Sequence, residues 1–166
     1  YYFYENSAKV PSLNKMEHEL SRCINEHLLY SFDDLSIFRK QGFEISQRDS
    51  NAVHTTVKFF DKKTIIDFSY DINVKKGSID VDVNEFGVEL PYSVKPFHDF
   101  SEEFIHDSDL NSSLVCITCL AELSRKYDFY SEMYDIGDPD ILFLLKDNHS
   151  IINEKLEFLF AINLKK

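Results

Sequence analysis

The sequence predicts an α+β fold in which helices pack on one face of a three-stranded antiparallel meander. Three observations predict this fold: strict alternation of apolar and polar residues over 64–74, renewed alternation over 79–83, and helical spacing of apolar residues on both sides. The 166 residues, 43% of them hydrophobic, can bury one sizeable core. We therefore expect a single α+β domain over residues 1–166.

Two helices are expected before the meander. From Leu13 to Phe32 apolar residues recur at spacings of three and four, and Ser12 precedes them as a candidate N-cap. A second, shorter helical pattern begins at Ser31, with acidic residues in its first turn, basic residues in its last turn and Gly42 beyond it. Residues 43–45 are a candidate extra strand.

The meander is expected over about 53–86, and its register follows from the alternation. Turns at 61–62 and 76–77 keep one face of the sheet apolar, whereas a slip of one residue would place apolar side chains opposite carboxylates. The expected facing pairs are Phe59 with Thr64, Val57 with Ile66, Thr55 with Phe68, Val74 with Ile79 and Ile72 with Val81. On the reverse face this register opposes Asp71 to Asp82, and such like-charge pairs cost up to about 1 kcal/mol.

Helical signals dominate the predicted structure after the meander. Pro91 ends regular pairing, so 88–94 is expected to be an edge segment or a loop. The acidic stretch 98–111 predicts a short helix capped by Ser101, and 114–130 predicts the principal buried helix, with a strand possible at its start.

The last third of the chain contains two further helix signals. Asp138-Pro139 is typical of a helix start, although 141–145 equally suits a buried strand. Ser150 is expected to cap a final helix. Its apolar face would be formed by Ile152, Leu156, Leu159 and Phe160.

The net charge and the cysteine content limit the kinds of partner and the cellular compartment that we expect for this protein. The formal net charge of −11 argues against nucleic-acid binding and favours a cationic partner. No apolar run is long enough for a membrane span, and three cysteines indicate a reducing compartment, so we expect a cytoplasmic protein. The chain begins at Tyr1 without a methionine, so we expect the native start to lie elsewhere.

No pattern in the sequence indicates a catalytic site, a cofactor or a metal. Cys116 and Cys119 form a Cys-x-x-Cys pair inside an apolar run, which we interpret as core cysteines rather than a redox or zinc site. The register places His54 across from Ser69, but a surface histidine is favoured over a general base because no nucleophile motif accompanies it.

The acidic residues of the meander have three interpretations: a site for a hard cation, a surface for a basic partner, or a solvated face. The second and third are favoured over the first. The predicted partner-binding residues are carboxylates of the sheet and of the following stretch, with nearby aromatic anchors whose alternative is core packing: Asp67, Asp71, Asp80, Asp82, Tyr92, Phe97, Asp99, Phe100, Glu102, Glu103, Phe104, Asp107 and Asp109.

In size, charge and composition the chain resembles the immunity proteins of bacterial toxin systems, particularly those paired with nuclease toxins. The residues behind the resemblance are the acidic sheet face and the stretch from Asp99 to Asp109. It implies a protein that neutralises a basic toxin domain. If the acidic sheet face binds that partner, charge reversal at Asp80 and Asp82 is expected to weaken binding. The chain is also similar to type III secretion chaperones, which dimerise and bind an effector, and a small enzyme is the third hypothesis.

Overall fold

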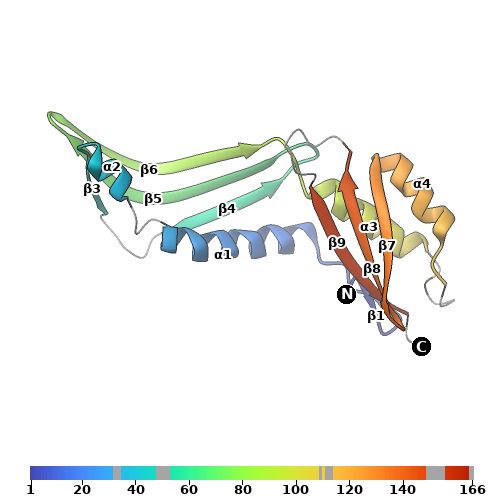
Figure 1. Cartoon of the computed structure of the whole chain (residues 1–166). Coiled ribbons are helices and arrows are strands. Elements are labelled where there is room, and N and C mark those ends of the chain that lie inside the picture. Colours follow the sequence, from blue (N-terminus) through green and yellow to red (C-terminus); the bar gives the residue numbers. More distant parts are fainter. Residues whose placement is uncertain (32–34, 48–52, 109, 111–113, 149–155, 165–166) are drawn as a thin grey trace. The chain divides into compact units, whose positions relative to one another are not determined.

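The structure is a computed structural model that describes residues 1–31, 35–47, 53–108, 110, 114–148 and 156–164 (Figure 1). It confirms the α+β class, because helices accompany two sheets built mainly from antiparallel strands. The chain divides into two compact units. We call Asn14–Pro91 the hairpin unit, and Tyr1–Leu13 together with Tyr92–Lys166 the terminal unit. The single-domain expectation stays a prediction, since this division does not test whether either unit folds alone.

The hairpin unit contains the predicted meander. Its central strand pairs with β6 along one edge and with β4 and β3 along the other. Both early helices are present, and the first has the predicted start at Leu13. In chain order the elements are α1 (Leu13–Ser31), α2 (Ser36–Lys40), β3 (Glu44–Gln47), β4 (His54–Phe59), β5 (Thr64–Lys76) and β6 (Ile79–Leu90).

The register of the first hairpin is confirmed. Phe59 faces Thr64, and the pairing continues without a shift as far as His54 opposite Ser69. Here alternation and turn position agree, and only this register keeps the apolar residues of both strands on one face. The candidate strand at 43–45 is also confirmed, as β3.

The register of the second hairpin was predicted wrongly by two residues. Lys76 faces Ile79, so the two-residue loop is Gly77-Ser78 rather than Lys76-Gly77. Gly77 has φ +59°, and a glycine with positive φ at the first loop position suits a type II′ turn. In consequence Asp82 faces Asn73 and not Asp71, and the predicted opposition of two aspartates does not occur.

A β-bulge at Tyr70 and Asp71 changes which face the apolar residues occupy. The register shifts between Ser69 and Ile72, so both bulge residues lie opposite the single residue Asn84 of β6. The apolar alternation of β5 runs through this point without interruption in sequence. Ile66 and Phe68 therefore lie on one face of the sheet, whereas Ile72 and Val74 lie on the other.

Helix α1 runs beside β4, the edge strand of the hairpin sheet (Figure 1), on the side where Thr55, Val57 and Phe59 of β4 are buried. It also satisfies backbone donors of β4. The Glu17 carboxylate accepts the Phe59 N–H at 2.9 Å and the Lys58 ammonium at 2.7 Å.

One turn later in α1, the Ser21 hydroxyl accepts the Val57 N–H at 2.9 Å. Two side chains of one helix therefore cover donors of β4 that would otherwise offer a pairing edge to another chain.

The terminal unit is a five-stranded sheet with two helices. The strand order is β2-β1-β9-β8-β7, antiparallel except for the parallel pair of β1 and β9. The elements are β1 (Phe3–Tyr4), β2 (Ser7–Ala8), α3 (Lys95–Asp107), α4 (Ile117–Tyr127), β7 (Phe129–Gly137), β8 (Asp140–Asp147) and β9 (Glu157–Asn163).

An aromatic core joins α3 and α4 to this sheet. Phe104 of α3 packs on Phe143 and Phe160, whose own rings stack at 4.9 Å, and Phe97 stacks on Phe129 at 4.3 Å. These five phenylalanines belong to one buried cluster with Leu120 and Leu123 of α4. Many of the fifteen phenylalanines of the sequence therefore pack in one core.

Two predictions for this part of the chain were wrong. The expected final helix is strand β9 over its described residues, and Asp138-Pro139 leads into strand β8, in agreement with the alternative proposed for 141–145. The helices α3 and α4 pack on the second sheet. Ser150 and Ile152 lie outside the described residues.

Candidate partner-binding surface

The face of the hairpin sheet that does not carry α1 is here called the open face. None of its described side chains is buried, in contrast to the face beneath α1. By strand alternation and the pairing register, it comprises Ile45, His54, Thr56, Lys58, Ile65, Asp67, Ser69, Ile72, Val74, Lys76, Ile79, Val81, Val83, Glu85, Gly87 and Glu89.

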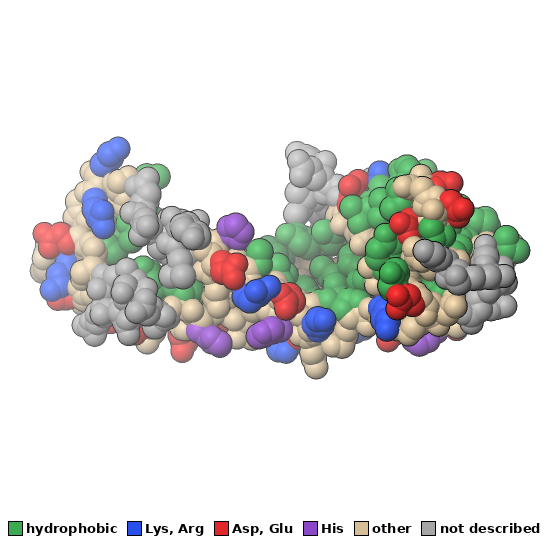
Figure 2. All heavy atoms as spheres, turned by 90° about the horizontal axis from the view of Figure 1, so that it is seen from below, with side chains coloured by type: hydrophobic (Ala, Val, Ile, Leu, Met, Phe, Trp, Pro, Cys, Tyr) green, Lys and Arg blue, Asp and Glu red, His purple; other side chains and the backbone are tan. Residues whose placement is uncertain are grey.

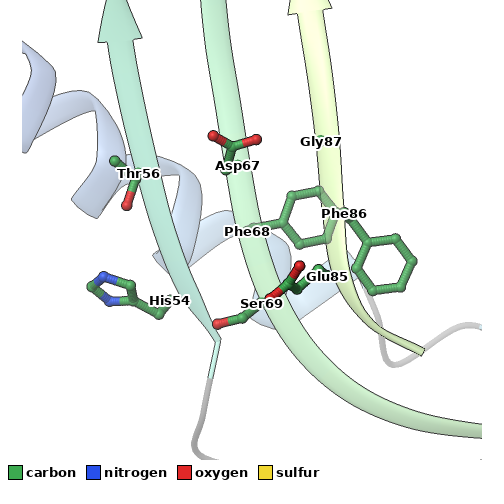
Figure 3. Close-up of a pocket in the computed structure, with 8 residues that line it drawn as sticks. All are labelled: His54, Thr56, Asp67, Phe68, Ser69, Glu85, Phe86 and Gly87. Carbon is green, nitrogen blue, oxygen red and sulfur yellow. The ribbon is translucent and has the colours of Figure 1, made fainter. Parts of the chain in front are cut away.

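One half of the open face holds an acidic pocket of about 380 Å³. Figure 3 shows its eight lining residues, contributed by three adjacent strands: His54 and Thr56 from β4, Asp67, Phe68 and Ser69 from β5, and Glu85, Phe86 and Gly87 from β6. The carboxylates of Asp67 and Glu85 supply its charge, and neither lysine nor arginine lines it. A pocket of this composition suits a cationic group.

Gly87 gives the Asp67 carboxylate its place in the pocket. The two residues face each other across β5 and β6, and a Cβ built on Gly87 would come within 3.0 Å of Asp67 Oδ1. A larger residue at position 87 would therefore push the carboxylate aside. The absence of a side chain at Gly87, not an unusual φ angle, leaves this space to the carboxylate.

Phe68 and Phe86, which also line the pocket, form a cross-strand pair whose side chains alternate onto the face of α1. The rings of Phe68 and Phe86 stack with centroids 5.0 Å apart and planes 8° apart. Such a pair stabilises the pairing of β5 with β6. The pair thereby holds together the two strands that carry Asp67 and Glu85 on the opposite face.

His54, Ser69 and Glu85 form one row across the three strands, because Ser69 faces His54 on one side and Glu85 on the other. This order differs from that of a nucleophilic triad, in which histidine lies between the nucleophile and the acid. The row is therefore better suited to hydrogen bonding a bound group than to activating the serine.

The other half of the open face is apolar. Beyond the bulge, Ile72 and Val74 of β5 lie beside Val81 and Val83 of β6. Val81 is 47% exposed and Ile79, at the end of the hairpin, is 61% exposed. An apolar strip next to a polar pocket is the arrangement expected of a protein interface, where apolar contacts and a few charged anchors act together.

The other predicted aspartates of the meander lie elsewhere. Asp80 and Asp82 are on the same face as α1, where the Asn73 amide donates to both carboxylates at 2.6 and 2.8 Å. Lys75 is 3.1 Å from Asp80. Asp71 lies in the bulge. Of the four predicted aspartates, the structure therefore brings only Asp67 into the pocket.

The predicted acidic stretch lies largely on α3, where two carboxylates already have cationic partners. Lys95 contacts Asp99 at 2.8 Å, and Lys126 donates to both oxygens of Glu103 at 2.6 Å. Hydrogen bonds from Lys126 and from the Tyr127 hydroxyl lower the pKa of Glu103. Burial and the bond to Glu103 raise the pKa of Tyr127. Glu102 and Asp107 are exposed, whereas Asp109 lies outside the described residues.

The predicted aromatic anchors belong mostly to the core. Phe97 is 2% exposed, and Phe100 and Phe104 are fully buried, in agreement with the alternative of core packing. Tyr92 is half-buried. The three phenylalanines offer a partner no ring surface in this structure.

The exposed side of α1 carries both signs of charge. Figure 2, which views the molecule from this side, shows basic, acidic and histidine side chains interspersed. The exposed residues there include Lys15 and Arg22 as well as Glu19 and Glu26, and Arg22 pairs with Glu19 at 2.6 Å. This side therefore lacks the local excess of negative charge found in the pocket.

The interpretation of Cys116 and Cys119 as core cysteines was wrong. The two sulfurs form a disulfide, Cys116 is the N-cap residue of α4, and both residues are half-buried. Within the described ranges, no three His, Cys, Asp or Glu side chains are grouped so as to hold a metal ion. Among those same residues, no helix has the length and apolarity needed to cross a membrane.

No protein-family model, curated protein sequence or solved structure matches this chain.

Proposed function

We propose that this chain is an interaction protein of the toxin-immunity type, which binds a basic protein partner and covers the partner's active surface. The observation that carries the proposal is the acidic pocket of the open face, where Asp67 and Glu85 lie on neighbouring strands without a lysine or arginine among the lining residues. A lysine or arginine side chain of the partner enters this pocket, and the apolar strip beside it supplies the remaining contact.

The charge of the whole chain supports the proposal. A net charge of −11 attracts a cationic partner from a distance and repels nucleic acid, so it favours a protein ligand over a phosphate-bearing one. The proposal includes a cytoplasmic location, because an inhibitor of a nuclease-type toxin has to meet the toxin where its nucleic-acid substrate lies.

The proposal is tested by using the full chain as bait in a lysate of the source cells and identifying the retained protein. A basic partner is expected. Its association rate should fall about tenfold or more between low and high salt, because steering by charge is screened, while its dissociation changes less. Stopped-flow mixing measures both rates. A neutral or acidic partner, or an association rate independent of salt, would contradict the proposal.

A secretion-type chaperone is the second candidate. It is favoured by the exposure of apolar side chains at the end of the hairpin, since Ile79 and Val81 are 61% and 47% exposed and could meet an unfolded client. Analytical ultracentrifugation separates the two candidates. A monomer that forms a defined complex supports the immunity-type function, whereas a tight dimer supports the chaperone.

A further inference from the structure

The disulfide between Cys116 and Cys119 lies at the start of helix α4. Cys116 is the N-cap residue, with extended backbone angles of φ −75° and ψ 92°, and the helix proper begins at Ile117. The Cys119 backbone N–H donates to Cys116 Sγ at 3.2 Å. The sulfur of Cys116 therefore occupies the position that an N-cap oxygen usually takes.

This position stabilises negative charge on one of the two sulfurs. The N–H groups of the first helical turn and the helix dipole favour an anion at Cys116, and the first turn of α4 contains no acidic side chain to oppose it. The Thr118 hydroxyl lies 3.4 Å from the same sulfur and can donate to it. Cys119 lies within the helix, so neither the N-cap position nor the Thr118 hydroxyl stabilises negative charge on its sulfur.

The bond does little to hold the fold together. It joins two residues three positions apart, within one helical turn, so it links no separate elements and closes a very short loop. Short loops restrain the unfolded chain least, and a structural staple normally joins distant parts of a chain. Stabilisation of the fold therefore does not explain why this disulfide is present.

The surroundings leave the pair accessible. Both cysteines are half-buried rather than buried, and the neighbouring Leu114 and Ile117 are 73% and 54% exposed. An apolar rim beside a disulfide provides a contact surface for a thiol-bearing protein segment. Disulfides of reducing compartments are mostly transient ones, so this pair is compatible with a cytoplasmic protein.

We propose that Cys116 and Cys119 are a redox-active pair that exchanges with disulfides of other proteins or of small thiol compounds. In the reduced form, the Cys116 thiolate attacks an external disulfide, forms a mixed disulfide and releases one external thiolate, which takes up a proton. Cys119 then loses its proton and attacks Cys116 Sγ, so that the internal disulfide forms and the second external thiol leaves. One external disulfide is reduced to two thiols, and an external dithiol returns the pair to its reduced state.

This inference is independent of the proposed partner-binding function, since it rests on α4 alone. The test uses the full chain with Cys23→Ser, which removes the exposed lone cysteine, as the background. Cys119→Ser leaves Cys116 alone, and Cys116→Ser leaves Cys119 alone. Each reduced variant is mixed with oxidised glutathione at a mildly acidic pH of about 6.5, where ordinary thiols are mostly protonated.

The Cys119→Ser variant should form the glutathione adduct about tenfold or more faster than Cys116→Ser, as followed by mass spectrometry. The reduced background chain should end as the internal disulfide with no retained adduct. Equal rates for the two single-cysteine variants, or a stable adduct on the background chain, would overturn the proposal.

A second measurement excludes a purely structural bond. The thermal unfolding of the oxidised and reduced background chain is followed by circular dichroism. Nearly equal midpoints are expected for a redox-active pair within one helical turn. Loss of cooperative unfolding on reduction would overturn the proposal, because the bond would then be a structural one.

Discussion

Replacing Asp67 and Glu85 together by lysine is expected to weaken binding of the basic partner by about 100-fold or more. Both carboxylates line the acidic pocket, and two ammonium groups there would repel the cationic group that the pocket accepts. Like charges forced together at an interface cost several kcal/mol, far more than the loss of an exposed ion pair. Isothermal titration calorimetry with the captured partner measures the effect.

The matched control is the double replacement of Asp80 and Asp82 by lysine. Each change of a carboxylate to an ammonium adds two positive charges, so both double variants move the net charge from −11 to −7. Steering by net charge is therefore altered equally, and only the location differs. We expect the control to bind within about threefold of the unmodified chain. If the control loses the greater part of the affinity, the interface lies on the face of Asp80 and Asp82 instead.

Glu17→Ala is expected to lower the free energy of unfolding of the hairpin unit by about 2–3 kcal/mol. Glu17 is 6% exposed, and its carboxylate accepts both the Phe59 N–H and the Lys58 ammonium. Alanine would leave the Phe59 N–H without its acceptor and leave a gap between α1 and β4. Urea unfolding followed by circular dichroism measures the change.

Glu19→Ala provides the control on the same helix. Among the described residues, the Glu19 carboxylate pairs with the exposed Arg22, and such pairs contribute about 0.5 kcal/mol. Glu17→Gln should fall between the two, because an amide oxygen can still accept the Phe59 N–H but carries no charge for Lys58. Equal stabilities of the Glu17→Ala and Glu19→Ala variants would show that the buried carboxylate does not support β4.

The elements of the hairpin unit were largely predictable because local patterns decide them. In α1, apolar spacing and Ser12 agree on a start at Leu13. In the first hairpin, alternation and the turn at 61–62 agree on one register, which is the one observed. Where two independent signals agreed in this way, the prediction was right.

The bulge at Tyr70 and Asp71 could not be read from the sequence. Apolar residues alternate without a break from Ile66 to Val74, so a sheet without a bulge is the natural interpretation. Because of the extra residue, the side chains of β5 beyond the bulge lie on the face opposite to the one that the alternation predicts. Asp67 is therefore on one face of the sheet, and Asp80 and Asp82 are on the other. The predicted acidic face was thereby divided between two sides of one sheet.

The candidate site was predicted in part. The row of His54 and Ser69 followed from the first hairpin, and Asp67 was among the expected partner-binding residues. Glu85 and Gly87 were missed, because their place beside the first hairpin depends on the register of β6, which the bulge shifts. The signal that could have found the loop is Gly77, since a glycine with positive φ favours the first position of a two-residue turn.

The second sheet was missed because its strands also carry helical signals. Ile152, Leu156, Leu159 and Phe160 follow helical spacing, while Phe158, Phe160 and Ile162 alternate as a strand that faces the aromatic core. Short apolar segments often fit both periods, and tertiary packing then decides between them. Here the aromatic rings of α3 select the strand.

Hydrogen–deuterium exchange on the chain alone and in complex with its captured partner tests most directly whether the open face binds the partner. We expect the partner to slow exchange mainly in the peptides that cover Asp67 to Val74 and Val81 to Gly87, which contain the acidic pocket and the apolar strip. Exchange in α3 and in the exposed turns of α1 should stay unchanged. Protection confined to α3 or α1, with β5 and β6 unaffected, would contradict the assignment of the open face as the partner-binding surface.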